Sequence, residues 1–390
     1  MMSTIFENSK EIQSWLVNLR RDFHRHPEPS LEEIRTSKII EEQLIKMGIK
    51  AERVCETGII GILEGKDSGK VIALRADMDA LSVSEKTGLP FASETPGIMH
   101  ACGHDFHVSM LLGAAKLLSQ MTNEFNGTVK FIFQPAEELA LGAKNLIKNG
   151  VLKNPDVDFV FGMHIWSDVP VNKVVVQQGA LMAGADTWNL TITGKSAHGS
   201  SPWQGKDAIV CAATVIQSLQ TIVSRTNDVR SPIVINIGTI KGGERFNVIP
   251  GSVKMEGMNR TFSSDTREKL PQWIEKVVKS TCEAYGCEYE FSYTPMTAVV
   301  INDEKGTELV KNSLDKILGE DAFIPSEKIM GSEDFSEYLE QVPGVLMLLG
   351  GRNEEKGCCY SQHSNFFDVD EDALPIGTAS YVQVALDYLK

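Results

Sequence analysis

The chain has 390 residues, of which 42% are hydrophobic and 23% are charged, and its formal net charge at pH 7 is −14. This length favours two domains over a single compact core, and the composition is typical of a soluble globular protein. The negative charge argues against nucleic acid or an anionic membrane as the natural partner.

The N-terminal residues and the cysteine content favour a cytoplasmic location. Residues 1–30 lack the basic start and apolar core of a signal peptide. No stretch approaches about 18 continuous apolar residues, so we expect no membrane span. The seven cysteines are scattered and odd in number, which favours a reducing compartment and mostly free thiols. We interpret Cys358 and Cys359, shortly before His363, as packing residues rather than redox-sensitive ones.

Helices and strands alternate in the first part of the chain. The pattern predicts amphipathic helices at 7–25 and 31–47, buried strands at 71–77, 128–134 and 157–166, and further helices at 104–120 and 139–149. Strands that alternate with helices predict a largely parallel sheet covered on both faces. The fold class that we expect is therefore α/β with a mostly parallel central sheet.

The middle of the chain has the order β-α-β-β-α-β, which is typical of a split-βαβ sandwich. Its strands are predicted at 186–194, 232–240, 252–262 and 287–293, and its helices at 205–224 and 264–286. The α/β pattern then resumes, with helices at 305–318, 332–341 and 371–389 and a strand at 344–351. We therefore divide the chain into a larger domain made of 1–182 and 296–390 and an inserted domain at 183–295.

Residues suited to metal binding stand at predicted strand ends and helix starts. They are Cys102, His104, Glu138, His164 and His363. Ligands of open α/β sheets bind beyond the carboxyl ends of the strands, so the topology would bring these segments to one edge. Thiolate, imidazole and carboxylate are ligands of zinc and related divalent metals. Five ligands exceed the need of one closed site, which favours two metals with Cys102 as a bridging ligand.

Each of these residues also has a purely structural interpretation. A lone histidine is usually a surface or core residue, and a free cysteine is usually a small buried apolar one. Asp77 and Asp79, at and just after the end of the 71–77 strand, could be turn residues. Cys102 with His104 could instead form a thiol nucleophile and its base, although residues two apart at a helix start diverge. The coincidence of five candidate positions at strand ends and helix starts favours a metal site.

Glu137 and Glu138 form an acidic pair after the 128–134 strand. Such a pair often does no more than complement a helix dipole. Adjacent residues in a turn point in different directions, so one carboxylate can bind metal while the other acts as general base for a water. We assign Glu138 to the metal and Glu137 to the base, although the sequence alone also allows the reverse.

Six motifs occur in one order along the chain: MHACGHDFHVSMLLGAAKLL, FIFQPAEE, GMHIW, TGKSAHGSSP, GGERFNVIP and MGSEDF, followed by His363. Together they resemble the metal-dependent amidohydrolase family of hippurate hydrolases, N-acyl-amino-acid amidohydrolases and plant auxin-conjugate hydrolases. This family belongs to the wider aminoacylase and di-zinc carboxypeptidase superfamily. The resemblance covers nearly the whole chain, and the first two motifs are the most specific.

The resemblance implies a di-metal catalytic domain with an inserted ferredoxin-like dimerisation domain. By motif, it gives Glu137 as the general base and the metal ligands as Cys102, His104, Glu138, His164 and His363. Asp77 matches an aspartate that supports the site. The usual first ligand motif of the superfamily, His-x-Asp, is here Arg75-Ala76-Asp77. His104 would then supply the equivalent ligand.

The inserted domain also carries residues with implied roles. His198 in GKSAHGS matches a histidine that, in superfamily dimers, reaches the partner's site and polarises the scissile carbonyl. Asn247 and Arg260 match positions that hold substrate, and a guanidinium suits a free α-carboxylate. Their structural interpretations are a turn residue and a strand-end charge. Glu333 in GSEDF is expected to line the pocket, without an assigned role.

The implied function is hydrolysis of the amide bond of N-acyl-L-amino acids, of the hippurate or N-acetyl-amino-acid type. The expected cofactors are two divalent metal ions per subunit, Zn or Mn first and Ni or Co next. The expected partners are the small-molecule substrate and a second copy of the chain, without nucleic acid or membrane. The alternatives are a carboxypeptidase or dipeptidase with the same site, a cysteine amidase, and an inactive binding homologue. The presence of Glu137 beside a full ligand set argues against the last.

Overall fold

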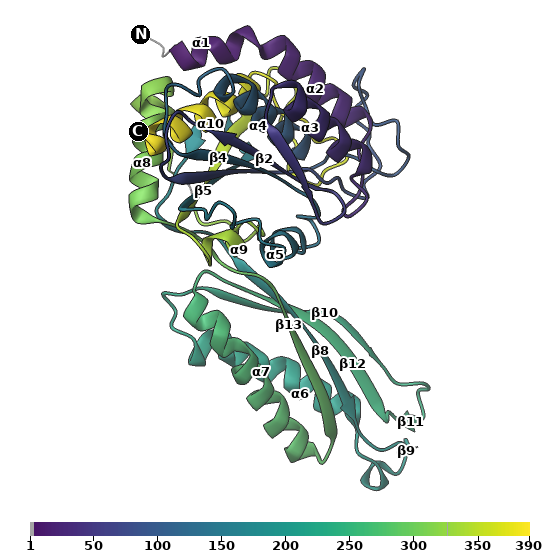
Figure 1. Cartoon of the computed structure of the whole chain (residues 1–390). Coiled ribbons are helices and arrows are strands. Elements are labelled where there is room, and N and C mark those ends of the chain that lie inside the picture. Colours follow the sequence, from purple (N-terminus) through teal and green to yellow (C-terminus); the bar gives the residue numbers. More distant parts are fainter. Residues whose placement is uncertain (1–3, 326) are drawn as a thin grey trace. The chain divides into compact units, whose positions relative to one another are not determined.

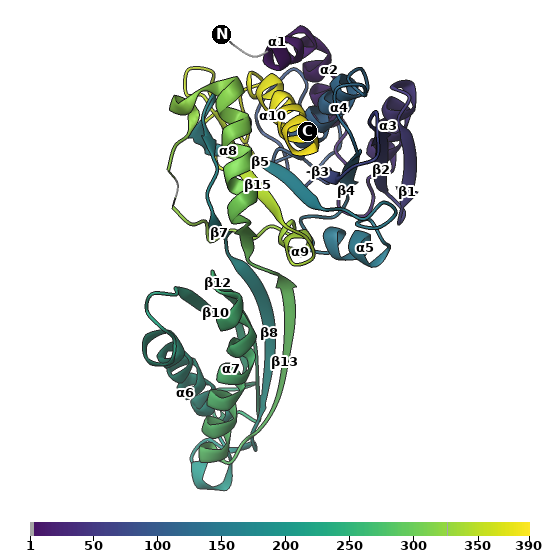
Figure 2. The ribbon, with the colours of Figure 1, turned by 60° about the vertical axis from the view of Figure 1, so that its left-hand side comes forward.

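The computed structural model describes residues 4–325 and 327–390, and the chain forms two compact units. The first unit extends to Gly179 and also contains Ile301–Glu327 and Asp334–Lys390. The second unit contains Ala180–Val300 together with the short segment Lys328–Glu333. Figures 1 and 2 show that each unit has its own sheet and its own helices. The expected inserted domain at 183–295 is a single range, whereas the second unit also includes the segment 328–333 from later in the chain.

A seven-stranded sheet forms the centre of the first unit. Its strands, in spatial order, are β1 (Lys50–Val54), β2 (Gly58–Glu64), β4 (Thr128–Gln134), β3 (Val71–Asp77), β5 (Phe159–Pro170), β15 (Gly344–Arg352) and β6 (Val174–Val175). The middle strands β4, β3, β5 and β15 pair in parallel, whereas β1–β2, β2–β4 and β15–β6 pair antiparallel. The sheet is therefore mixed, and the prediction of a mostly parallel sheet is wrong for its outer strands.

Helices cover both faces of this sheet (Figure 1). On one face lie α4 (His104–Leu118) and α10 (Ala373–Leu389), with α1 (Thr4–Glu11), α2 (Gln13–Arg25), α3 (Ile34–Lys46) and α8 (Glu304–Leu318) packed around them. On the other face lie α5 (Gly142–Lys148) and α9 (Ser336–Leu339). A single turn, η3 (Glu320–Ala322), follows α8. Nearly every residue of α4 and α10 is buried, as expected of helices enclosed between a sheet and other helices.

The second unit has the order β-α-β-β-α-β and an antiparallel sheet. Its strands, in spatial order, are β10 (Ile233–Gly242), β12 (Ser252–Thr261), β8 (Gly184–Thr193) and β13 (Glu288–Thr297). The helices α6 (Ala208–Thr221), continued by the π-turn η2 (Ile222–Thr226), and α7 (Ser264–Tyr285) cover one face of this sheet (Figure 2). The small elements are a ribbon of β9 (Ala197–His198) and β11 (Val248–Ile249), the turn η1 (Pro202–Gln204), and the connecting strands β7 (Gly179–Met182) and β14 (Val300–Asn302).

One helix of the second unit, Ala208–Thr226, is long and apolar enough to cross a membrane by length and composition alone. Our expectation of no such segment rested on continuous apolar runs, which this helix lacks. Its buried residues include Cys211, Val215 and Leu219, which pack into the apolar core of the second unit. A core helix passes the same test, so this single segment is weak support for a membrane span.

Candidate metal centre

The five candidate ligands come from four separate segments of the first unit. Cys102 and His104 lie at the start of α4, Glu138 follows β4, His164 lies within β5, and His363 lies in the loop between β15 and α10. The ligand atoms form two compact groups: Cys102 with His104 and His164, and Cys102 with Glu138 and His363. Within each group the atoms lie within 4.8 Å of one another. The structure therefore brings all five residues together, and Cys102 belongs to both groups.

Two of the histidines direct the same ring nitrogen at this centre. The Nδ1 of His104 bonds to the carbonyl of Asp79 at 2.9 Å, and the Nδ1 of His164 bonds to the carbonyl of Ile165 at 2.7 Å. A carbonyl accepts only, so in the neutral form of each ring Nδ1 carries the proton and Nε2 keeps a lone pair. Histidine ligands of metals are commonly fixed in this way by a bond through the other nitrogen.

The unpaired atoms of the centre fit a bound cation. The Nε2 of His104 and the Oε1 of Glu138 are buried and have no hydrogen-bond partner. They lie 3.9 Å apart, and the Nε2 of His363 lies 3.5 Å from the same Glu138 oxygen. Cys102 Sγ lies 3.4 Å from His164 Nε2. Buried polar atoms without partners are costly, and a divalent cation would satisfy these acceptors together.

The backbone at the centre takes conformations that direct the ligands inward. Gly103, between two candidate ligands, has a φ of +89°, and a Cβ there would lie 2.3 Å from Ile165 Cγ2. Only glycine fits this turn. Ala136, just before the acidic pair, and His363 itself also have positive φ angles, of +52° and +66°. Such strained residues persist where the surrounding structure fixes them, often at functional sites.

Three aspartates hold the segments around the centre through hydrogen bonds. Asp77 accepts from Nδ1 of His107, whose Nε2 in turn accepts the N–H of Ile165, so both nitrogens of that ring are occupied. Asp79 accepts the backbone N–H groups of Glu137 and Glu138, each at 3.1 Å. Asp105 accepts from the buried Arg20 and from His24, both at 2.8 Å, and so anchors the start of α4.

The charges around the centre shift the pKa values of its groups. Burial alone would raise the pKa of Asp77, but His104 and Arg75 hold it well below the usual value. Burial would likewise lower the pKa of His104, but Asp77 holds it well above the usual value. Burial and the nearby Glu138 raise the pKa of the Cys102 thiol well above its ordinary range. A cysteine nucleophile needs the opposite shift.

The remaining predicted residues lie on the second unit. His198 and Asn247 are exposed, in or next to the β9–β11 ribbon. The Nδ1 of His198 accepts the N–H of Ser200 at 3.1 Å, so the neutral ring carries its proton on Nε2. Arg260, in β12, donates from Nη1 to the carbonyl of Met330 at 2.6 Å. Glu333 is buried and belongs to the same unit.

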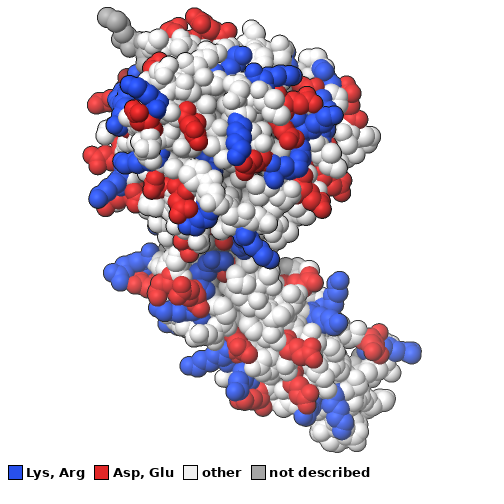
Figure 3. All heavy atoms as spheres, in the orientation of Figure 1, with Lys and Arg blue, Asp and Glu red and all other residues white. Residues whose placement is uncertain are grey.

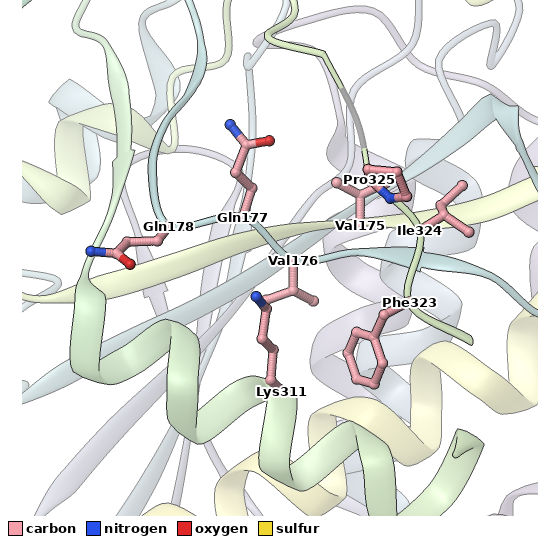
Figure 4. Close-up of a pocket in the computed structure, with 8 residues that line it drawn as sticks. All are labelled: Val175, Val176, Gln177, Gln178, Lys311, Phe323, Ile324 and Pro325. Carbon is pink, nitrogen blue, oxygen red and sulfur yellow. The ribbon is translucent and has the colours of Figure 1, made fainter. Parts of the chain in front are cut away.

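A surface cavity of the first unit lies apart from these residues. Figure 4 shows its lining, which consists of Val175, Val176, Gln177, Gln178, Lys311, Phe323, Ile324 and Pro325. None of these is a candidate ligand, base or support residue. The metal centre is therefore identified by its convergent ligand atoms and not by the shape of this cavity.

Sequence reasoning missed the roles of two supporting residues. Asp79 stands among the polar residues at the end of a predicted strand but has no role assigned from the sequence, although it holds the backbone of the acidic pair. Asp334 was overlooked beside Glu333, although it is fully buried and its N–H lies 3.3 Å from Glu137 Oε1. The GSEDF motif was the available signal, but nothing in it distinguishes the two acidic residues.

The chain has a mixed α/β sheet with an inserted α+β unit, and thiol, imidazole and carboxylate groups converge in its first unit. Together these features define a class of hydrolases built from two units. Residues 73–387 match the model of the peptidase family M20/M25/M40. The chain belongs to this family and is a hydrolase of its amidohydrolase and peptidase type.

Individual relatives span nearly the whole chain. An N-acetylcysteine deacetylase of Bacillus subtilis is 38% identical, over 98% of both chains. Thermostable carboxypeptidase 1 of Saccharolobus solfataricus is also 38% identical, over 97% of this chain and 96% of the relative. The crystal structure of the YXEP protein of Bacillus subtilis, described as a dinuclear metal binding peptidase of the M20 family, superposes with a TM-score of 0.86. It is 36% identical and covers 97% of this chain and 99% of its own.

Proposed function

We propose that the protein hydrolyses the amide bond of N-acyl-L-amino acids, releasing a carboxylate and a free amino acid. The observation that carries the proposal is the convergence of Cys102 with His104 and His164 and with Glu138 and His363. Within these groups, the buried Nε2 of His104 and Oε1 of Glu138 have no hydrogen-bond partner. The B. subtilis deacetylase, at 38% identity over 98% of both chains, supports the substrate class.

Two divalent metal ions per subunit are proposed as cofactors, Zn or Mn first and Ni or Co next. Their ligands would be Cys102, His104, Glu138, His164 and His363, with Cys102 shared. Bound there, such ions would supply Lewis acidity to the scissile carbonyl and lower the pKa of a water. The description of the YXEP protein as dinuclear supports the count.

The chain's own groups would carry the proton and the substrate. Glu137 is buried beside Glu138 and would take the proton of the attacking water on its carboxylate and deliver it to the amide nitrogen. His198 would donate from Nε2–H to the carbonyl oxygen as negative charge develops there. Arg260 would bind the α-carboxylate of the substrate, and Asn247 would also contact the substrate.

His198 is proposed to act across a homodimer formed through the second unit. Its ring stands exposed on the β9–β11 ribbon, which suits a donor that enters another subunit's site. A cytoplasmic location stays a prediction that rests on the sequence.

Cleavage of dipeptides or of C-terminal residues is the second candidate function. The S. solfataricus carboxypeptidase is as similar to this chain as the deacetylase, at 38% identity, so overall similarity favours neither. The same metals and base would serve both reactions, and the pocket around the acyl group would decide between them.

The test compares N-acetyl and N-benzoyl amino acids with dipeptides, using the wild-type protein and Glu137→Gln. We expect the wild type to prefer the N-acyl substrates, and Glu137→Gln to lose about 10²–10⁴-fold in kcat. Preference for dipeptides would select the second function. Wild-type turnover in Glu137→Gln would contradict the assignment of the base.

A further inference from the structure

The carboxylate of Asp334 is one of the most fully buried in the first unit, and the proposed reaction gives it no part. It accepts hydrogen bonds from Arg75 Nη2 at 2.8 Å, from Gln134 Nε2 at 2.7 and 2.9 Å, and from the Ala143 N–H at 3.0 Å. These donors come from β3, β4 and α5. A buried carboxylate held from three elements has a single orientation, and so does the peptide group that carries it.

The peptide group of Asp334 faces the proposed base. Its N–H donates to Oε1 of Glu137, with an N···O distance of 3.3 Å. The backbone of Glu137 is itself held, because its N–H donates to Asp79 at 3.1 Å. The chain therefore fixes Glu137 at both its backbone and its carboxylate.

Arg75 links this arrangement to the candidate metal ligands. Its guanidinium is buried and donates from Nη1 to Asp77 at 2.6 Å and from Nε to Gln134 at 2.9 Å, besides its bond to Asp334. Asp77 lies 3.7 Å from Nε2 of His104. A planar guanidinium holds three acceptors at fixed angles, which a lysine could not do.

We propose that Asp334 is a positioning residue for the reaction, which acts by holding the carboxylate of Glu137 through its backbone N–H. Arg75 and Gln134 fix Asp334, and Asp334 fixes the oxygen of Glu137. The inference rests on the proposed function, because it assigns Glu137 the proton transfer. A base misplaced by about 1 Å can lose about 10²-fold in rate.

The test is Asp334→Asn, which keeps the size of the side chain but places an NH₂ group where a carboxylate oxygen accepted from two donors. We expect kcat on an N-acetyl amino acid to fall about 10²-fold, while KM and the metal content stay at wild-type values. The matched control is Asp186→Asn in the second unit. Asp186 is a buried carboxylate that accepts from Arg267, from the Tyr293 hydroxyl and from the Met296 N–H. That variant should lose stability but keep its kcat.

Two results would overturn the inference. One is wild-type kcat in Asp334→Asn, and the other is a loss of kcat in both variants that simply follows their loss of stability. A second experiment measures no enzyme activity and does not use the Asp334→Asn protein. In Glu137→Ala, hydrogen exchange at the Asp334 amide, followed by mass spectrometry, should become faster than in the wild type, and unchanged exchange would overturn the inference. If the wild type hydrolyses no N-acyl amino acid, the proposed function fails, and this second experiment alone decides the contact.

Discussion

The two units of the chain bury polar groups in very different ways. The first unit buries several carboxylates, guanidinium groups and imidazoles within and beside its parallel strands, among them Arg75, Asp77, Asp79, His104 and Asp334. The core of the second unit is built almost wholly of apolar residues around Trp188, and its buried carboxylates are Asp186, paired with Arg267, and Glu333. On the face drawn in Figure 3, basic and acidic side chains are interspersed over both units, so surface charge does not separate the units there.

The concentration of buried charged groups in one unit indicates where a chemical site lies. Burying an ionised group costs free energy unless it is paired and hydrogen-bonded, so a fold has no thermodynamic reason to concentrate such groups. The concentration in the first unit therefore marks a chemical site.

Removal of the metals should have the largest effect and should act on the first unit alone. We expect a chelator to abolish hydrolysis and added Zn²⁺ or Mn²⁺ to restore it. Hydrogen exchange should rise in 99–107 and 134–140, because a ligand that binds only the native state stabilises it. Exchange in β8 and β12 should stay unchanged. Hydrolysis by protein shown to be metal-free by elemental analysis would contradict the account.

Loss of His198 should give the next largest effect, now from the second unit. We expect His198→Ala to lower kcat by about 10²–10³-fold, the usual effect of removing one donor to a developing oxyanion, with the metals retained. Mixing this variant with Glu137→Gln tests the dimer. If His198 acts across it, randomly mixed dimers should recover about a quarter of wild-type turnover, because half are mixed and each of these has one intact site. No recovery after subunit exchange would argue against action between subunits.

The smallest effect concerns two aspartates in contrasting surroundings. Burial would raise the pKa of Asp370, but hydrogen bonds from Lys356 and Asn353 hold it below the usual value. Because the folded-state pKa lies below the unfolded value of about 3.9, the stabilisation is full above that pH and is lost as the pH falls toward the folded-state pKa. Asp370→Asn should therefore lower the free energy of unfolding by about 1 kcal/mol at neutral pH.

The matched comparison is the exposed pair of Asp228 and Arg230, whose hydrogen bond lowers the pKa of Asp228 to about 2. Asp228→Asn should not change stability measurably, because solvent screens an exposed pair. Urea unfolding at pH 7 and at about pH 3 measures both variants. An Asp370→Asn effect that is the same at both pH values would show that the ion pair is not its cause.

The sequence was most informative where the signal is local. The strands β3, β4, β5 and β15 follow from short buried runs, and the candidate ligands lie within or after these strands or at the start of α4. The hairpin of β1 and β2 was missed because its glycines interrupt the apolar run of GIIGILE. The roles of Asp79 and Asp334 depend on contacts between distant segments, which no local pattern records. The helix expected over 332–341 shortens to Ser336–Leu339, because Asp334 is held by β3, β4 and α5 instead.

The most direct test of the central claim compares two adjacent variants, Glu137→Gln and Glu138→Gln, by the metal content of each purified protein. Both residues are glutamates in the same turn, but we assign proton transfer to Glu137 and metal binding to Glu138. It predicts that the wild type and Glu137→Gln hold about two ions per chain, as in a two-metal site, and that Glu138→Gln loses at least one. Equal metal loss in both variants, or full retention in Glu138→Gln, would contradict it.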